Sequence, residues 1–191
     1  MNRFFESIKY SWKAKGRHGI HSPFVYDLVD NCFQLALSKK QLKTVASKVG
    51  TKSTSLKLLT QLSKHLGFGR VLTNLKEIET LQSFLHQQNI QAEVDAFNYQ
   101  EKKGIEVKSS LIFIECSQFD PSSWENIIEL IPTLDDHSLI VLSGIRTRHF
   151  TLNEWDKLIS HSSFHFTADL FHFGLLSKRT FQEKEHFVLR Y

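Results

Sequence analysis

The chain has 191 residues, a formal net charge of +4 and 41% hydrophobic residues, a composition typical of a globular protein with one domain and a small extension. No apolar run reaches the length of a membrane-spanning helix, and no signal-peptide core follows the early basic residues. Three prolines and eight glycines exclude a long low-complexity linker. Cys32 and Cys116 lie far apart in apolar contexts, which predicts buried free thiols and a cytoplasmic location.

The first segment predicts an amphipathic helix, with Phe4, Phe5, Ile8 and Trp12 on one face. Residues 1–21 contain five Lys and Arg residues against one acidic residue, so this segment carries the whole net charge of +4. We expect the aromatic face to pack on its own domain. A membrane surface and single-stranded RNA are the alternative partners of a basic, aromatic helix.

A basic stretch with two glycines, KAKGRHGIHSPFVYDLV, follows from Lys13. Ser22 is a favourable N-cap that should accept a first-turn hydrogen bond, and Pro23 suits the first position of a helix. Apolar residues then recur every four positions over about four turns. Arg17, His18 and His21 therefore stand with Ser22 at the positive end of a helix. There they form either an anion site or a structural motif that fixes how the extension enters this helix.

Further helices are expected at 39–49 and 53–66, after which the apolar period changes. Short buried strands then alternate with helices, which predicts βαβ units in a parallel, doubly wound sheet. The strands are expected at 70–73, 92–97, 111–114 and 139–142, and the helices at 76–88, 124–131 and 152–159. We therefore divide the chain into a helical extension, residues 1–66, packed on an α/β domain, residues 67–191.

The last segments follow one another without room for a helix. Residues 164–169 alternate in polarity, and the apolar segments 173–176 and 186–191 follow. This pattern predicts an antiparallel hairpin at the edge of the sheet, with an antiparallel pair near Phe166 and Val188.

A mostly parallel Rossmann-like sheet that ends in an antiparallel pair resembles the class I S-adenosylmethionine-dependent methyltransferases. A bacterial family within this class opens with a basic segment and a GRHGIHSPFVYDLV-like motif, which stands here almost letter for letter at residues 16–29. The resemblance continues through Leu58-Leu59, Trp155 and the DLFxxGLL-like segment from Asp169 to Leu176. It covers nearly the whole chain and implies a methyltransferase-like protein with S-adenosylmethionine as its cofactor.

The chain departs from this family where the cofactor would bind. The family has a glycine-bearing turn after the first strand, and this sequence has Thr73 and Asn74 with no glycine before Gly104. One βα unit, either the first or the second, is missing by length. By resemblance, Thr73, Asn74, Glu77 and Glu115 are the candidate cofactor-binding residues. Glu77 and Glu79 are the two candidate acids for the ribose hydroxyls, and Glu115 keeps a carboxylate where the family has an IDGNH-like turn.

A second loss follows the strand at 139–142, where Ser143-Gly144 stands in place of an acidic pair suited to a metal or a substrate hydroxyl. We therefore expect no cofactor, with binding of S-adenosylmethionine no tighter than about 1 mM. No catalytic residue is assigned.

Other site chemistries are weaker. His161 and His165 are four residues apart, but they fall on a predicted loop and strand, so we assign no metal site. Ser22 lacks the GxSxG setting of a hydrolase nucleophile. The preferred hypothesis is a degenerate, non-catalytic methyltransferase-like protein that acts through binding or structure. The alternatives are an active methyltransferase with an atypical pocket and a protein that binds RNA or a membrane surface through its basic N-terminus. Its partners are left open, with an anionic ligand or a protein partner possible at that terminus.

Overall fold

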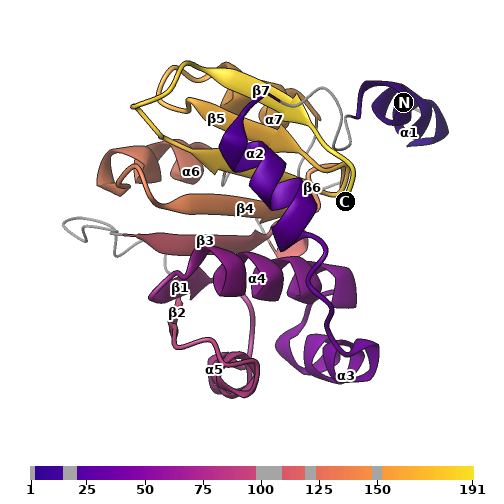
Figure 1. Ribbon diagram of the computed structural model, residues 1–191, viewed down its shortest axis with the longest axis vertical. Coiled ribbons are helices and arrows are strands. Elements are labelled where there is room, and N and C mark those ends of the chain that lie inside the picture. Colours follow the sequence, from indigo (N-terminus) through magenta and orange to yellow (C-terminus); the bar gives the residue numbers. More distant parts are fainter. Residues whose placement is uncertain (1–2, 15–20, 98–108, 119–123, 148–151) are drawn as a thin grey trace.

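The computed structural model describes residues 3–14, 21–97, 109–118, 124–147 and 152–191. These residues form a seven-stranded sheet in the order β2-β1-β3-β4-β6-β5-β7, flanked by helices on both faces (Figure 1). The strands are β1 (Arg70–Thr73), β2 (Glu93–Ala96), β3 (Ser110–Glu115), β4 (Leu139–Ser143), β5 (Phe166–Asp169), β6 (Phe173–Ser177) and β7 (Glu185–Val188). The helices are α1 (Arg3–Lys13), α2 (Pro23–Asp27), α3 (Lys39–Val49), α4 (Ser53–Leu66), α5 (Ile78–Gln87), α6 (Trp124–Leu130) and α7 (Leu152–Ser160).

Strands β2, β1, β3 and β4 are parallel, and the chain leaves β1 toward β2 on one side while β3 lies on the other. The order of the strands therefore reverses between β1 and β3, as it does in doubly wound sheets. This confirms the predicted α/β class with a mostly parallel sheet. Ligands of such sheets bind beyond the carboxyl ends of the strands.

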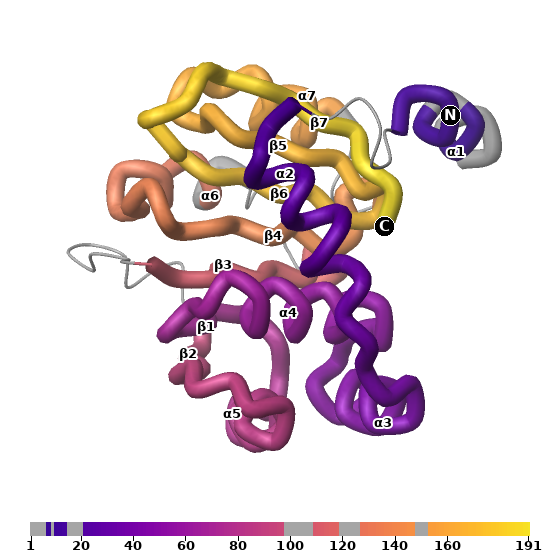
Figure 2. Tube along the Cα trace, in the orientation of Figure 1, coloured from indigo at the N-terminus to yellow at the C-terminus, as the bar shows by residue number. Residues whose placement is uncertain are grey.

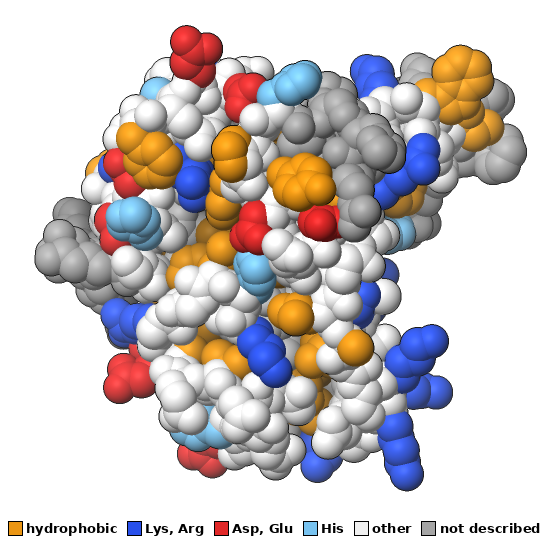
Figure 3. Space-filling view, in the orientation of Figure 1, with side chains coloured by type: hydrophobic (Ala, Val, Ile, Leu, Met, Phe, Trp, Pro, Cys, Tyr) orange, Lys and Arg blue, Asp and Glu red, His pale blue; other side chains and the backbone are white. Residues whose placement is uncertain are grey.

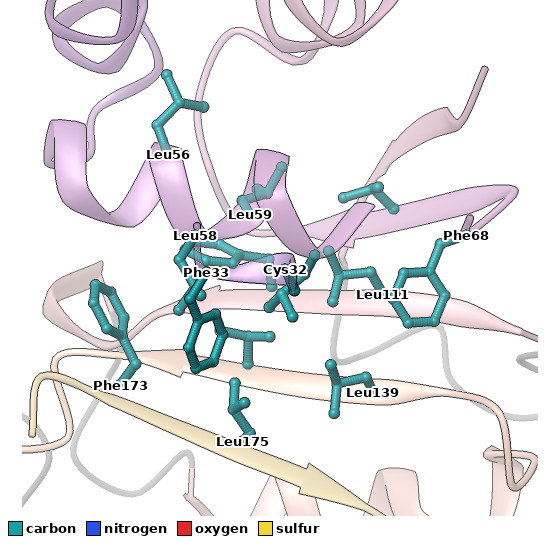
Figure 4. Packing of buried hydrophobic residues seen from close by; sticks show 14 of the residues in the cluster. Cys32, Phe33, Leu56, Leu58, Leu59, Phe68, Leu111, Leu139, Phe173 and Leu175 are labelled. Atoms are coloured by element: carbon teal, nitrogen blue, oxygen red, sulfur yellow. The ribbon is translucent and has the colours of Figure 1, made fainter. Parts of the chain in front are cut away.

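The two faces of the sheet are covered by different helices because alternate residues of a strand point to opposite faces. Leu111 and Phe113 of β3 belong to an apolar cluster that also contains residues of α2, α3, α4 and α5. Ile112 and Ile114 belong to a second cluster with residues of α6 and α7. Figure 4 shows the first cluster between α4 and the strands. Helix α4 thus packs directly on the sheet, and the expected domain boundary at residue 66 stays a prediction.

The segment after Pro23 is shorter than the expected four turns. Pro23 opens α2, as expected, and a single π-helical turn, η1 (Leu28–Cys32), continues it. The turn closes when the Phe33 N–H donates to the Leu28 carbonyl at 2.9 Å. Val25 and Leu28 are fully buried, and Phe24 is half-buried with its ring edge-on to Phe166. The apolar periodicity therefore predicted the buried face correctly.

The C-terminal strands pair differently from the expectation. Strand β6 lies between β4 and β5 and is antiparallel to both. β7 is parallel to β5, with Phe166 opposite Glu185 and Asp169 opposite Val188. The antiparallel pair exists, but its placement near Phe166 and Val188 was wrong, because the segment between β6 and β7 carries the chain back along the sheet before β7 begins.

The predicted packing of Ile8 and Trp12 of α1 on the domain was also wrong, and the side chains of Phe4 and Phe5 lie outside the described residues. Trp12 is 88% exposed and Ile8 is 40% exposed, whereas Ala14 is buried. Tyr10 faces the sheet domain instead: its hydroxyl donates to the Leu189 carbonyl, and its ring lies 5.0 Å from that of Phe171. Helix α1 projects from one side of the molecule (Figure 2), and hydrophobic side chains gather at the outer part of this projection (Figure 3).

Both cysteines are free and buried, as predicted. Burial raises the pKa of the Cys32 thiol to about 12, and it raises the pKa of the Cys116 thiol well above its usual value. Both thiols therefore stay protonated at neutral pH and behave as small apolar groups. Within the described residues, no helix has the length and apolar character needed to cross a bilayer.

Candidate functional site

A cavity of about 590 Å³ lies at the carboxyl ends of β3 and β4, a volume typical of small-molecule sites. Its walls come from the end of α3, the α3–α4 loop, the first turn of α4, and the turns that follow β3, β4 and β5, with one residue from α1. The lining residues are Ser7, Ala46, Ser47, Gly50, Thr51, Lys52, Thr54, Ser55, Glu115, Ser117, Ser143, Gly144, Arg146, Thr147, Phe171, His172 and Phe173.

The Glu115 carboxylate is the centre of a hydroxyl network in this cavity. Thr51 donates to Glu115 Oε2 at 2.6 Å, and Ser143 donates to the same oxygen at 3.0 Å. Ser117 donates to Oε1 at 3.0 Å. Since the Ser143 hydroxyl has one proton and gives it to Glu115, the Ser55 hydroxyl, 2.9 Å from Ser143, is the donor of that pair. Three donors therefore hold the carboxylate of Glu115, a residue that is only 5% exposed.

The position after Ser143 requires glycine. Gly144 has φ +92°, and a Cβ atom built there would lie 2.9 Å from the Thr147 methyl group. The Gly144 N–H donates to the His172 carbonyl at 2.7 Å, which ties the turn after β4 to the turn between β5 and β6. The Ser143-Gly144 pair thus shapes the floor of the cavity and orders a hydroxyl against Glu115.

A buried ion pair forms another part of the wall. Arg146 donates from Nη1 to Asp169 Oδ1 at 2.9 Å and from Nη2 to Oδ2 at 2.6 Å. The side chains are 12% and 8% exposed. The Phe171 N–H also donates to Asp169 Oδ1, and the Arg146 guanidinium lies 4.9 Å from the centre of the Phe171 ring. The bidentate geometry fixes Arg146 as a rigid cationic wall.

The end of β1 is closed by one side chain. Asn74 Nδ2 donates to the Glu115 carbonyl at 3.1 Å, and the Glu115 N–H donates to Asn74 Oδ1 at 2.8 Å. Thr73 is buried, and its hydroxyl accepts from the Leu75 N–H at 3.2 Å. Glu77 is exposed in a left-handed conformation, φ 52°, just before α5. Of the four candidate cofactor-binding residues, only Glu115 lines the cavity.

His21 and Ser22 of the N-terminal motif do not line the cavity. Ser22 precedes α2, but its side chain makes no capping hydrogen bond, so that prediction was wrong; its carbonyl accepts from the Tyr26 N–H at 2.9 Å instead. His21 is exposed, and Arg17 and His18 lie outside the described residues. The proposed anion site at this motif stays a prediction.

The histidines near the C-terminal strands have other partners. A ring nitrogen of His165 lies 2.6 Å from the Gln182 carbonyl oxygen, and Asp169 pairs with Arg146. Among the described residues, no group of three or more His, Cys, Asp and Glu side chains is arranged to hold a metal ion.

Sequence reasoning missed two parts of the cavity. The first is the α3–α4 loop and the first turn of α4, where Thr51, Thr54 and Ser55 supply hydroxyl groups; the TKSTS run at 51–55 was a visible signal for it. The second is Arg146, 23 residues before its partner Asp169, which no local pattern marks.

No protein-family model matches the sequence, and no curated protein matches it. Among solved structures, a methyltransferase from Geobacter sulfurreducens is similar with a TM-score of 0.49 and 13% identity, covering 76% of this chain and 92% of that chain. Cofactor-bound Rv0187 from MTB is similar with a TM-score of 0.41 and 15% identity, covering 76% of this chain and 83% of that chain.

Proposed function

We propose that this chain is a methyltransferase-like protein that binds a small polar molecule in the cavity and does not transfer methyl groups. The proposal rests on the sequence resemblance, on the doubly wound sheet, and on a cavity at the edge where such sheets hold ligands. Fold alone assigns no activity, so the argument depends on the side chains at this edge.

One observation carries the proposal: the Asn74 side chain occupies the end of β1 and is bonded to both backbone groups of Glu115. In the resembling family, a glycine-bearing turn at this point lets the backbone approach the cofactor. A filled turn does not fit S-adenosylmethionine in that manner, so we derive no step through it.

The carboxylate nearest this edge supports the same conclusion. A Glu side chain that holds ribose hydroxyls must accept hydrogen bonds from the ligand. Glu115 already accepts three from Thr51, Ser117 and Ser143, and a carboxylate offers about four acceptor sites. The polar groups in the walls that a ligand can contact include the exposed Ser47, Lys52, Thr54 and His172 and the buried Thr147 hydroxyl, and Phe171 and Phe173 also line the cavity.

The test is a calorimetric titration of the full chain with S-adenosylmethionine and S-adenosylhomocysteine. We expect no binding tighter than about 1 mM, which corresponds to roughly −4 kcal/mol. Adenosine and methionine, titrated separately, report whether either half of the cofactor binds alone. Micromolar affinity for the whole cofactor would refute the proposal.

The second candidate is an active methyltransferase with an atypical pocket. The observation in its favour is the cavity itself, which is open at the carboxyl ends of β3 and β4 and has Arg146, Lys52 and Glu115 in its walls. Micromolar binding that is lost in Glu115→Ala and kept in Glu183→Ala, an exposed position on the segment between β6 and β7, would favour this candidate.

A further inference from the structure

Helix α1 exposes an apolar strip. Trp12 is 88% exposed and Ile8, one turn earlier, is 40% exposed. Side chains four residues apart stand one above the other on a helix, so these two form a continuous strip. Tyr10 lies between them in sequence but points the other way, because two residues span about 200° around a helix. Its contacts with Leu189 and Phe171 fix the strip on the outer side of α1.

The contacts of α1 give the strip a defined orientation. Ala14 is buried and Ser7 lines the cavity, so the inner side of the helix is already used by the fold. The outer side carries an indole ring and an aliphatic side chain in water. Removing this apolar surface from water is favourable, so the strip is suited to a partner that takes up apolar groups along one helix face.

The positive charge of the same segment indicates that the partner is negatively charged. Residues 1–21 hold five Lys and Arg residues and one acidic residue, while the remaining 170 residues are balanced. Lys13, at the end of α1 beside Trp12, is exposed. Positive charge next to an exposed tryptophan complements a surface that is both anionic and able to accept an indole ring.

We propose that α1 docks on an anionic lipid surface, with Ile8 and Trp12 at the boundary between headgroups and acyl chains and Lys13 among the headgroup phosphates. Ile8 separates this partner from single-stranded RNA, because base stacking uses aromatic rings and cations and gains nothing from an aliphatic side chain. The inference concerns a surface outside the cavity and does not depend on the proposed function.

The experiment is co-sedimentation of the full chain with vesicles of phosphatidylcholine alone and of phosphatidylcholine with added phosphatidylglycerol. We expect binding to the anionic vesicles, a loss of binding at high salt, and a blue shift of the tryptophan emission that Trp12→Ala abolishes, since Trp12 is 88% exposed. Trp12→Ala should weaken binding by about tenfold or more.

The matched control is Phe181→Ala. Phe181 is 62% exposed, like Trp12 a large aromatic side chain in water, but it lies on the segment between β6 and β7. This variant should bind anionic vesicles as the natural chain does, and thermal melting should show that both variants fold. The proposal is overturned if the natural chain does not sediment with anionic vesicles, if neutral vesicles bind it equally, or if Trp12→Ala binds unchanged. It is also overturned if Trp12 is needed for binding an oligoribonucleotide or for self-association while vesicles do not bind.

Discussion

The ends of β1 and of β3 and β4 lie along one edge of the same sheet, but they differ in what fills the space beyond them. After β1, the Asn74 side chain bonds to the backbone of Glu115 and closes the turn. After β3 and β4, short hydroxyl side chains and Gly144 leave a cavity of about 590 Å³. The comparison teaches that one amide side chain at a strand end is enough to close part of such an edge while the neighbouring part stays open.

The largest expected effect comes from Asn74→Ala, which opens the closed end. The change leaves the Glu115 N–H and carbonyl without their partners, and each buried backbone group left unpaired costs about 1–3 kcal/mol. We expect the free energy of unfolding to fall by about 3 kcal/mol in urea titrations. The control Asn153→Ala, at an exposed position of α7, should change it by less than about 0.5 kcal/mol. A loss below that level for Asn74→Ala would mean that the amide does not hold the turn.

At the cavity, a methyl group added at Gly144 is expected to lower the stability more than the loss of the Glu115 charge. Gly144→Ala places a Cβ against Thr147 at a positive φ, which should cost about 2 kcal/mol. The double variant Gly144→Ala with Thr147→Ser removes the opposing methyl group and should recover part of the loss, leaving the backbone strain. Thermal unfolding of the single and double variants measures both parts. Full recovery would show that φ at this position carries no strain.

Glu115→Gln tests the hydroxyl network of the cavity, and it is expected to lower the stability less than Gly144→Ala. The amide keeps the shape of the side chain, and the hydroxyls of Thr51, Ser117 and Ser143 can rotate to donate to the remaining oxygen or to accept from the new NH₂ group. We expect a loss of about 1 kcal/mol. Thr51→Val in the Glu115→Gln background should then add less than Thr51→Val alone, since the pair is coupled in a double-mutant cycle. Additive losses would contradict the network.

The smallest expected effect on stability concerns Asp27 and His65. His65 lies in the last turn of α4, at the opposite end of the helix from the turn that lines the cavity. The Asp27 carboxylate accepts from Asn31 at 2.7 Å and lies 2.5 Å from a ring nitrogen of His65. Hydrogen bonds from Asn31 first, and then from His65, lower the pKa of Asp27. A carboxyl whose pKa is lower in the folded chain stabilises the fold above its unfolded pKa, and that contribution is lost as the pH falls through the folded value.

The stability difference between the natural chain and Asp27→Asn should therefore be present above about pH 4 and shrink at lower pH. It should stay below about 1 kcal/mol, because the Asp27 side chain is 43% exposed. Urea unfolding over a pH series measures it, with Glu183→Gln as an exposed carboxylate control. A difference that grows on acidification would reverse the assigned sign.

The helices and strands were predicted well from the sequence, because the patterns that indicate them are local. Helices 39–49 and 53–66 show apolar periodicity and end at glycines in the left-handed conformation, and the buried strands β3 and β4 are continuous apolar runs. Pairing direction has no such signal: the alternation in β5 and β7 is the same whether the two strands run parallel or antiparallel.

The site was predicted less well because it depends on contacts between distant segments. Glu115 was found as a carboxylate at a strand end, but Thr51 reaches it from 64 positions earlier. The amphipathic pattern of α1 indicated an apolar face. It did not indicate which face of the helix packs on the domain. Tyr10, placed outside the predicted apolar face, makes the contact instead.

The same Tyr10 contact constrains the order of events during synthesis. Tyr10 and Leu189 are separated by 179 positions, and β4 receives its second neighbour only when β6 has been made. Because a ribosome makes the chain from its N-terminus, α1 is synthesised long before the segment around Leu189 that Tyr10 contacts. The Tyr10 contact of α1 therefore forms only after residue 189 has been made, later than the pairing of β3 with β4.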